Sequence, residues 1–186
     1  MDSDHALLSA WHGGDDTAGR RLFERHFDRV ARFFANKVET DAEDLVQATF
    51  LACAESSARF EGRASFAAFL LGIAHKVLLK HLRRRYGRGR TLCLGQASLR
   101  DLCASPSSMV ARNIEQQRLL DALRTLPVHE QVVVELYYWE SLSAAELGRL
   151  LEVPEGTVRT RLRSARQRLE QKLRRSLPMP TPRLAS

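Results

Sequence analysis

The sequence has few cysteines and no long apolar run. Its 186 residues include only three cysteines, which form no Cys-x-x-Cys pair and no cluster with histidine at zinc-binding spacing. We therefore expect neither a disulfide framework nor a metal site, and reduced thiols in the cytoplasm are the default. No apolar stretch approaches the roughly 18 residues that span a membrane. Residues 1–5 are acidic and lack the order of a signal peptide, so we expect a cytoplasmic protein without membrane insertion.

The sequence also lacks the motifs of common enzyme active sites. It contains no glycine-rich phosphate-binding loop, no nucleophile motif and no metal-ligand spacing. Its histidines and acidic residues fall on the faces or at the ends of predicted helices. We therefore expect no enzymatic activity, no catalytic residue and no cofactor.

Positive charge is what the sequence has in excess. Lysine and arginine together number 29 against 22 acidic residues, which gives a formal net charge of +7. Such a charge suits a polyanionic partner, for example a nucleic acid. Many soluble proteins are equally basic, however, so the arrangement of the charges has to decide.

Residues 143–169 have the pattern of two helices joined by a tight turn. Ser143 is a natural N-cap, and Glu146 three residues later completes a capping box. Pro154 and Gly156 interrupt the first helix and are tolerated in the first turn of the second. A capped helix, a turn and a basic amphipathic helix predict a helix-turn-helix, which places its second helix in a DNA major groove.

The second helix of this motif is expected to have an apolar face and a basic face. Its apolar stripe consists of Val158, Leu162, Ala165 and Leu169. The side chains that we expect to contact DNA are Arg159, Thr160, Arg161, Arg163, Arg166 and Gln167. An ordinary helical hairpin with solvated arginines is the alternative. The absence of matching carboxylates on the arginine face favours DNA, because solvated helices usually interleave the two signs.

A second basic cluster follows an apolar helical stripe between residues 66 and 77. It begins at His75 and continues through Lys76, Lys80, Arg83 and Arg84, with no acid between residues 63 and 100. These cations repel one another unless a phosphate backbone neutralises them. A solvated helix end, stabilised by its own dipole, is the alternative, but it needs only one or two cations.

Two helices are predicted before this cluster. The apolar residues of the first recur at helical spacing, which predicts core packing for Leu22, Phe23, Phe27, Val30, Phe33 and Phe34; Asp16 is a possible N-cap for it. The second begins near residue 40 with Asp41, Glu43 and Asp44, where carboxylates complement the helix dipole. The same acids could also dock a basic partner.

Glycine, serine and proline divide the chain into parts. Residues 86–112 show no sustained period, and fully extended they could reach on the order of 90 Å. We therefore expect an all-α protein with two small helical domains on a flexible linker. The expected parts are an N-terminal domain (1–85), the linker (86–112), a four-helix domain with the helix-turn-helix (113–175) and a disordered tail (176–186).

Several stretches, in this order, resemble the small extracytoplasmic-function sigma factors of bacterial RNA polymerase. The helix-turn-helix, with Leu142-Ser-Ala-Ala-Glu146 and Val153-Pro-Glu-Gly-Thr-Val-Arg-Thr-Arg-Leu162, resembles their C-terminal DNA-binding domain. Residues 59–62 and 65–74, followed by the basic helix, resemble the part that melts and reads the −10 element. Residues 41–50 resemble the segment that binds the clamp helices of the largest polymerase subunit.

The resemblance implies a factor that binds core RNA polymerase, at the clamp helices and the flap, and directs promoter-specific initiation. The helix-turn-helix residues would then read the −35 element. The −10 element would be contacted by Phe60, Arg63, Ser65, His75, Lys76, Lys80, Arg83 and Arg84. The polymerase would be contacted by Asp41, Asp44 and Gln47. An anti-sigma factor is the further partner that the resemblance implies.

The chain departs from the family pattern at Ala48, Phe69, Lys76 and Ser164. The competing hypothesis is a free-standing helix-turn-helix regulator. Such a protein would need an effector domain or a dimerisation helix where residues 1–85 lie. Those residues instead offer a second basic helix and an acidic docking helix.

Overall fold

The computed structural model describes residues 3–38, 40–60, 62, 65–86 and 114–176, and every regular element among them is a helix. The predicted all-α class is therefore confirmed. Residues 87–113 and 177–186, which hold nearly all of the expected linker and tail, lie outside the described residues, as does Arg63.

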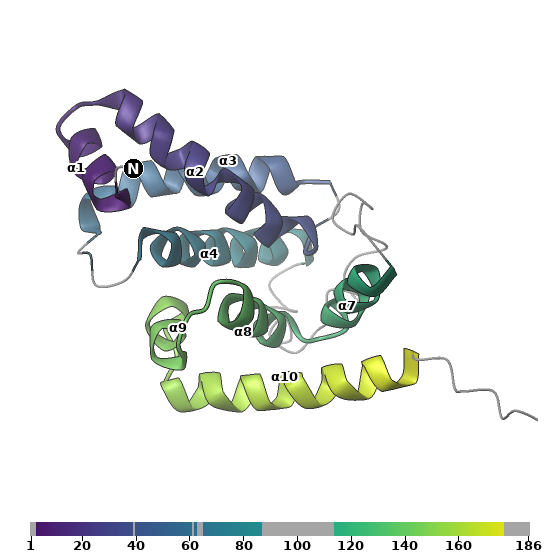
Figure 1. The fold of residues 1–186 in the computed structure, drawn as a ribbon. Coiled ribbons are helices and arrows are strands. Elements are labelled where there is room, and N and C mark those ends of the chain that lie inside the picture. The colour runs from purple at the N-terminus through teal and green to yellow at the C-terminus, as the bar shows by residue number, and fades with distance from the viewer. Residues whose placement is uncertain (1–2, 39, 61, 63–64, 87–113, 177–186) are drawn as a thin grey trace, which may run out of the picture.

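Four α-helices and one 3-10 turn make up the N-terminal half (Figure 1). They are α1 (Asp4–His12), α2 (Asp16–Ala35), α3 (Ala42–Ser56), η1 (Ser57–Arg59) and α4 (Phe66–Tyr86). Helix α2 packs against α1, α3 and α4. It buries Leu22, Val30 and Phe34 at helical spacing, and α4 contributes Leu70 and Leu78 to the same core.

Two details of α2 differ from the sequence-based expectation. Asp15, not Asp16, is the N-cap, because its carboxylate accepts hydrogen bonds from the backbone N–H groups of Thr17 and Ala18. Phe27 was expected in the core but is 52% exposed. Its ring stacks on Phe50 of α3 at the surface, with 6.3 Å between the ring centroids.

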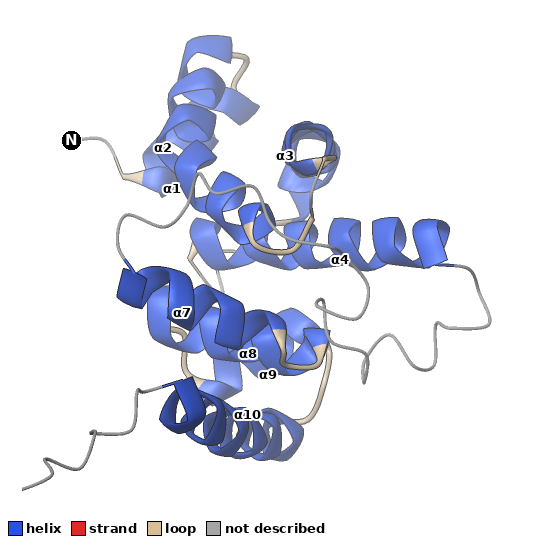
Figure 2. Ribbon diagram, turned by 90° about the vertical axis from the view of Figure 1, so that its right-hand side faces the viewer, coloured by secondary structure: helices blue, strands red, loops and turns tan. Residues whose placement is uncertain are grey.

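Four further helices make up the C-terminal half. They are α7 (Ile114–Arg124), α8 (Val128–Trp139), α9 (Ala144–Leu151) and α10 (Glu155–Ser176). Helix α8 is the central element, because Val132, Val133 and Leu136 are buried on it and α7, α9 and α10 all contact it. Figures 1 and 2 both show α8 between α4 and α10.

Helices α9 and α10 form the predicted helix-turn-helix. The capping box is present: the Ser143 hydroxyl accepts from the Glu146 N–H, and the Glu146 carboxylate accepts from the Ser143 N–H. Glu152 ends α9 in the left-handed conformation, with φ 57°. The next N–H, of Val153, then donates to the Gly148 carbonyl at 2.9 Å. The turn is thereby closed tightly against Gly148.

The two halves pack against each other, and their buried apolar side chains form one continuous core. Helix α9 crosses α4 at Gly72, where an added Cβ would lie 3.3 Å from Leu150 Cγ. Asn36 and Lys37, directly after α2, reach Glu135 of α8. Contacts between the halves therefore include both apolar packing and buried polar groups.

None of the described helices is both long enough and apolar enough to cross a bilayer.

We predict that Gly148→Ala destabilises the helix-turn-helix. A Cβ at Gly148 would lie 2.9 Å from the Val153 carbonyl oxygen, so the backbone of the turn would have to shift. We expect the free energy of unfolding, measured by denaturant titration, to fall by about 1–3 kcal/mol. Gly156→Ala is the matched control, because nothing lies within 4 Å of its Cβ position. Equal effects of the two substitutions would contradict this description of the turn.

Candidate nucleic-acid interface

Helix α10 presents most of the predicted −35 residues on its outer face. Val158, Leu162 and Ala165 are buried against the rest of the C-terminal half, which turns the opposite face to solvent. The exposed side chains on that face are Arg159, Thr160, Arg163, Arg166 and Gln167. Arg161 is half-buried and lies close enough to His75 of α4 to influence its pKa.

Arg159 is not isolated on this face. Its guanidinium donates to the Glu155 carboxylate one turn earlier, with Nε 2.9 Å from Oε1. Arg174 has the same relation to Glu170. The sequence-based expectation of an arginine face without matching acids was therefore wrong at Arg159. Exposed pairs of this kind contribute only about 0.3–0.5 kcal/mol, so the arginines can exchange them for other acceptors.

The middle of α10 contacts α8 through polar groups. The Arg166 guanidinium lies over the rings of Tyr137 and Tyr138, at 5.7 and 5.5 Å from their centroids. The Ser164 hydroxyl donates to the buried Glu130 carboxylate at 2.8 Å. Ser164, one of the departures from the family pattern, therefore has a structural partner inside this half.

The predicted −10 residues lie on α4 and just before it, and those that the structure describes have different environments. Lys76, Lys80, Arg83 and Arg84 are exposed along the helix. Ser65 caps the helix by accepting from the Ala68 N–H at 3.1 Å. Phe60 is half-buried in an aromatic cluster, with its ring 5.9 Å from that of Phe66 and 5.1 Å from that of Phe69.

His75 and Lys76 lie where α4 meets the helix-turn-helix. Lys76 donates to Glu152, at the end of α9, at 2.6 Å. Burial, together with the cations Arg161 and Lys37, lowers the pKa of His75 to about 4. His75 is therefore a neutral imidazole at physiological pH, not a cation that would attract phosphate.

The three predicted polymerase residues do not share one environment. Asp44 and Gln47 are exposed on α3, and Leu51 continues the same face with 63% exposure. Asp41 is half-buried before α3 and faces His81 and Arg85 of α4, both at 3.5 Å. Asp44 and Gln47 are thus free to meet another molecule, whereas Asp41 is engaged within the fold.

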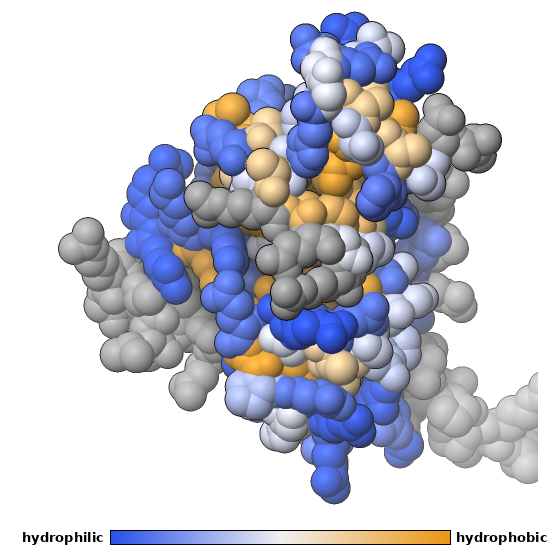
Figure 3. All heavy atoms as spheres, turned by 90° about the vertical axis from the view of Figure 1, so that its left-hand side faces the viewer, coloured by the Kyte–Doolittle hydropathy of each residue, from blue (hydrophilic) through white to orange (hydrophobic). Residues whose placement is uncertain are grey.

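Figure 3 views the face that includes α1 and α9. Apolar atoms are exposed in its upper middle and in a band lower down, and hydrophilic atoms surround them. Within the described ranges, no three His, Cys, Asp or Glu side chains lie close enough together to hold a metal ion.

The sequence analysis missed the polar groups between the halves, namely Asn36, Lys37, Glu135 and Glu152. A signal exists for Glu135, since it is the one charged residue within the apolar run 132–136. Lys37 is less conspicuous, although it directly follows the buried Phe33, Phe34 and Asn36. Nothing in the sequence indicates that Lys37 and Glu135 pair with each other, because they are 98 positions apart.

Two family models match this chain. The model described as Sigma-70 region 2 matches residues 22–88, and the model described as Sigma-70, region 4 matches residues 116–169. The first match spans α2 to α4 and the second spans α7 to most of α10. The −10 and polymerase residues fall in the first match, and the −35 residues fall in the second.

Several curated proteins are similar along most of the chain. SigM of Mycobacterium tuberculosis, an ECF RNA polymerase sigma factor, is 32% identical over 171 residues, which cover 90% of this chain and 83% of SigM. The sigma factor CarQ of Myxococcus xanthus is 31% identical, with 89% and 95% covered. The ECF sigma factor BldN of Streptomyces coelicolor is 30% identical, with 86% of this chain covered. The match spans only 63% of the length of BldN.

Two solved structures share the fold. One is the sigma factor RpoE in complex with the anti-sigma factor NepR from Bartonella quintana, with a TM-score of 0.65 and 20% identity over 85% of this chain and 98% of that one. The other is CnrH in complex with the cytosolic domain of CnrY, with a TM-score of 0.66 and 24% identity over 95% and 100%. At these identities the likeness concerns the fold alone.

We predict that His75 makes the free energy of unfolding depend on pH. Its pKa is about 4 in the folded chain against 6.5 for an ordinary histidine, so the unfolded chain binds the proton first. Stability is therefore fully present above pH 6.5 and falls as the pH decreases toward 4. The charged groups that act on His75 are Arg161, Lys37, Lys76 and Arg83, with Glu152 opposing them.

His75→Gln should make this dependence less steep when urea unfolding is measured between pH 7 and 5. Part of it should remain, because burial also lowers the pKa of His129 to about 4. The same substitution at the exposed His5 is the control for the loss of one imidazole. A slope that His75→Gln leaves unchanged would show that this histidine is not the group responsible.

Proposed function

Since this chain belongs to the extracytoplasmic-function sigma factors, we propose that it binds core RNA polymerase and directs promoter-specific initiation of transcription. The observation that carries this proposal is the presence of two separate basic helical surfaces, on α4 and α10, within the two matched sigma regions. A protein that acts with RNA polymerase works in the cytoplasm and initiates transcription without catalysing a reaction itself.

We propose that α10 reads the −35 element. Arg159, Thr160 and Arg163 are exposed in its N-terminal half, which is the part of a recognition helix that reaches base edges. Arginine forms bidentate hydrogen bonds with guanine, and Glu155 holds the Arg159 guanidinium extended along the helix before DNA binds. Arg166 and Gln167 lie further along the helix and suit contacts with phosphates.

We propose that α4 and the residues before it contact the −10 element. Lys76, Lys80, Arg83 and Arg84 are a row of exposed cations that can follow a phosphate backbone. The half-buried Phe60 packs near the start of α4 and offers part of an aromatic ring there, and unstacked bases stack on such rings. Ser65 has an indirect role, because its hydroxyl caps the N-terminus of α4. Neutral His75 can donate or accept a hydrogen bond.

The exposed face of α3 is the proposed polymerase contact. Asp44 and Gln47 offer a carboxylate and an amide, and Leu51 adds an exposed apolar side chain on the same face. We assign Asp41 a supporting role, because it is already paired with α4. The exposed Tyr138 and Trp139 on α8 are a second apolar surface, suited to the polymerase flap.

We further propose that a protein inhibitor of the anti-sigma class binds this chain. The RpoE structure was solved with the anti-sigma factor NepR, and the CnrH structure with the cytosolic domain of CnrY. The likeness of fold makes the same kind of complex feasible here.

Transcription in vitro tests the proposed function directly. Core RNA polymerase should produce discrete transcripts from genomic fragments only when this protein is added, and their 5′ ends should define shared −10 and −35 sequences. A free-standing regulator would instead bind DNA alone and would not restore initiation to core polymerase. Failure of the mixture to initiate on any fragment would contradict the proposal.

We predict that Asp44→Arg weakens binding to core polymerase. The substitution reverses a charge on an exposed face without disturbing the core, so a clash with a basic partner surface is the expected cause. Affinity should be measured by fluorescence titration of labelled protein with core enzyme. Asp121→Arg, an exposed site on α7, makes the same charge change as a control. Unchanged affinity of the Asp44 variant would remove α3 from the interface.

We predict that Arg159→Ala lowers transcription and relaxes the base preference at one −35 position. Loss of one bidentate contact corresponds to about 1–3 kcal/mol of discrimination. Arg166→Ala is the comparison: it should weaken binding to all sequences and reduce the salt slope by about one unit. Promoter libraries transcribed by the two holoenzymes provide the measurement. Unchanged promoter choice in the Arg159 variant would show that this residue does not read bases.

A further inference from the structure

A buried ion pair joins the two halves of the chain. Lys37, directly after α2, is fully buried, and Glu135 of α8 is 2% exposed. The Lys37 ammonium contacts the Glu135 carboxylate. One charge comes from each half, so neither can be paired in this way unless the halves are docked.

Nearby polar groups satisfy both members of this pair. The Lys37 ammonium also donates to the Phe33 carbonyl at 2.7 Å and to the Asn36 side-chain oxygen at 3.1 Å. The Glu135 carboxylate also accepts from Asn36 at 2.7 Å and from Gln131 at 2.8 Å. Burial is the largest influence on Lys37 and lowers its pKa, and Glu135 opposes that effect. A buried pair with such complete hydrogen bonding specifies one docking geometry.

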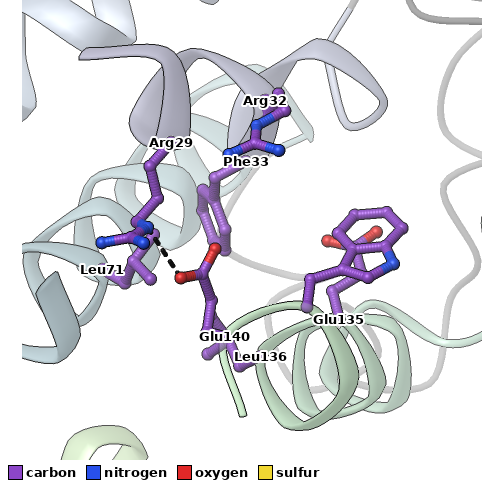
Figure 4. A pocket seen from close by; sticks show the side chains of 8 residues that line it. Arg29, Arg32, Phe33, Leu71, Glu135, Leu136 and Glu140 are labelled. Atoms are coloured by element: carbon purple, nitrogen blue, oxygen red, sulfur yellow. Dashed lines mark ion pairs between the residues drawn. The ribbon is translucent and has the colours of Figure 1, made fainter. Parts of the chain in front are cut away.

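Further contacts surround the buried pair at the edge of the interface. Arg29 of α2 and Glu140, just after α8, form an ion pair at 2.7 Å. Figure 4 shows this pair at a small crevice, with Phe33 and Leu71 on the side of the N-terminal half. The Lys76–Glu152 pair lies beside α9. The interface between the halves therefore has the buried Lys37–Glu135 pair at its centre and apolar side chains around it. The Arg29–Glu140 and Lys76–Glu152 pairs lie at its edge.

The docked arrangement cannot engage both promoter elements at once. By their names, the −35 and −10 elements lie about 25 base pairs apart, which is roughly 85 Å of B-form DNA. In the structure the C-terminal end of α9, the first helix of the helix-turn-helix, contacts α4. The Lys76 ammonium and the Glu152 carboxylate lie 2.6 Å apart. The two reading surfaces must therefore separate before a promoter can be bound.

We propose that Lys37 and Glu135, with Asn36 and Gln131, form an interhalf latch that holds the free chain closed, and that binding to core RNA polymerase opens it. The inference rests on the proposed function for what opening achieves. The claim that the latch keeps the two halves together does not depend on whether core RNA polymerase is the partner that opens it.

The latch predicts opposite effects for different substitutions. Glu135→Lys opposes two cations at the centre and should open the chain. Lys37→Met and Glu135→Leu must be combined with Asn36→Leu and Gln131→Leu, because the two buried amides would otherwise lose the Glu135 carboxylate that accepts from them. This apolar variant removes both charges and all of the polar groups that they need, which should favour the closed form. Arg29→Glu should open the chain from the accessible edge, and Arg29→Glu with Glu140→Arg should restore closure.

Two measurements on the full-length variants test the latch. Small-angle X-ray scattering reports the radius of gyration of the free chain, and stopped-flow fluorescence reports its binding to core polymerase. If the open form is about 10% of the free wild-type chain, opening variants should bind core polymerase up to about tenfold more tightly. The apolar variant should have the wild-type radius and should bind more slowly.

The outcomes separate the latch from the proposed function. Circular dichroism shows whether each variant is folded, and if Glu135→Lys unfolds, the Arg29 pair of variants decides. An unchanged radius of gyration in folded Glu135→Lys or, failing that, in Arg29→Glu would overturn the latch. If the radius changes as expected but neither wild type nor variants bind core polymerase, the latch stands and the proposed function fails.

Discussion

An ammonium group and a carboxylate, contributed by opposite halves of the chain and buried together, determine how this molecule is arranged. Removing a charge from water is costly, and the mutual attraction of Lys37 and Glu135 offsets that cost only in the docked geometry. In such a site, loss of one partner costs about 3–5 kcal/mol, whereas replacement of both by apolar groups is often neutral or stabilising. The pair therefore contributes more to the precision of docking than to its strength. That property suits an interface that has to open.

The same interface balances attraction against repulsion. Helices α4 and α10 are both basic, and Arg161 and Lys37 lie close enough to His75 to lower its pKa. Acidic groups on the C-terminal half, Glu135, Glu140 and Glu152, oppose this repulsion by pairing with cations of the N-terminal half. A sigma factor needs its cations for DNA. Lys76, one of the cations that we propose for the −10 element, is paired with Glu152 in this arrangement.

The local features of the fold were predictable from the sequence, because they depend on neighbours within one or two turns. The capping box at Ser143 and the buried stripe from Val158 to Ala165 were both predicted and are both present. The start of α2 shows the limit of such predictions. Asp15 and Asp16 have the same chemistry, and only the geometry of the chain makes Asp15 the N-cap. Contacts between distant residues left little signal: Lys37 and Glu135 are 98 positions apart, and no periodicity connects them. The assignment of individual side chains to DNA or polymerase remains a prediction from exposure and family pattern.

The distance between the two halves, measured in the free chain and in the promoter complex, tests the central claim most directly. Spin labels at Ala58 and Ala145, which are exposed in different halves, would report it after Cys93 and Cys103 are changed to serine. Cys53 would stay unlabelled, because burial raises the pKa of its thiol to about 12. The account predicts one narrow distance distribution for the free chain. With core polymerase on a promoter, the distance should be longer by tens of Å, since the elements lie roughly 85 Å apart. The same distance in both states, or a broad distribution in the free chain, would contradict it.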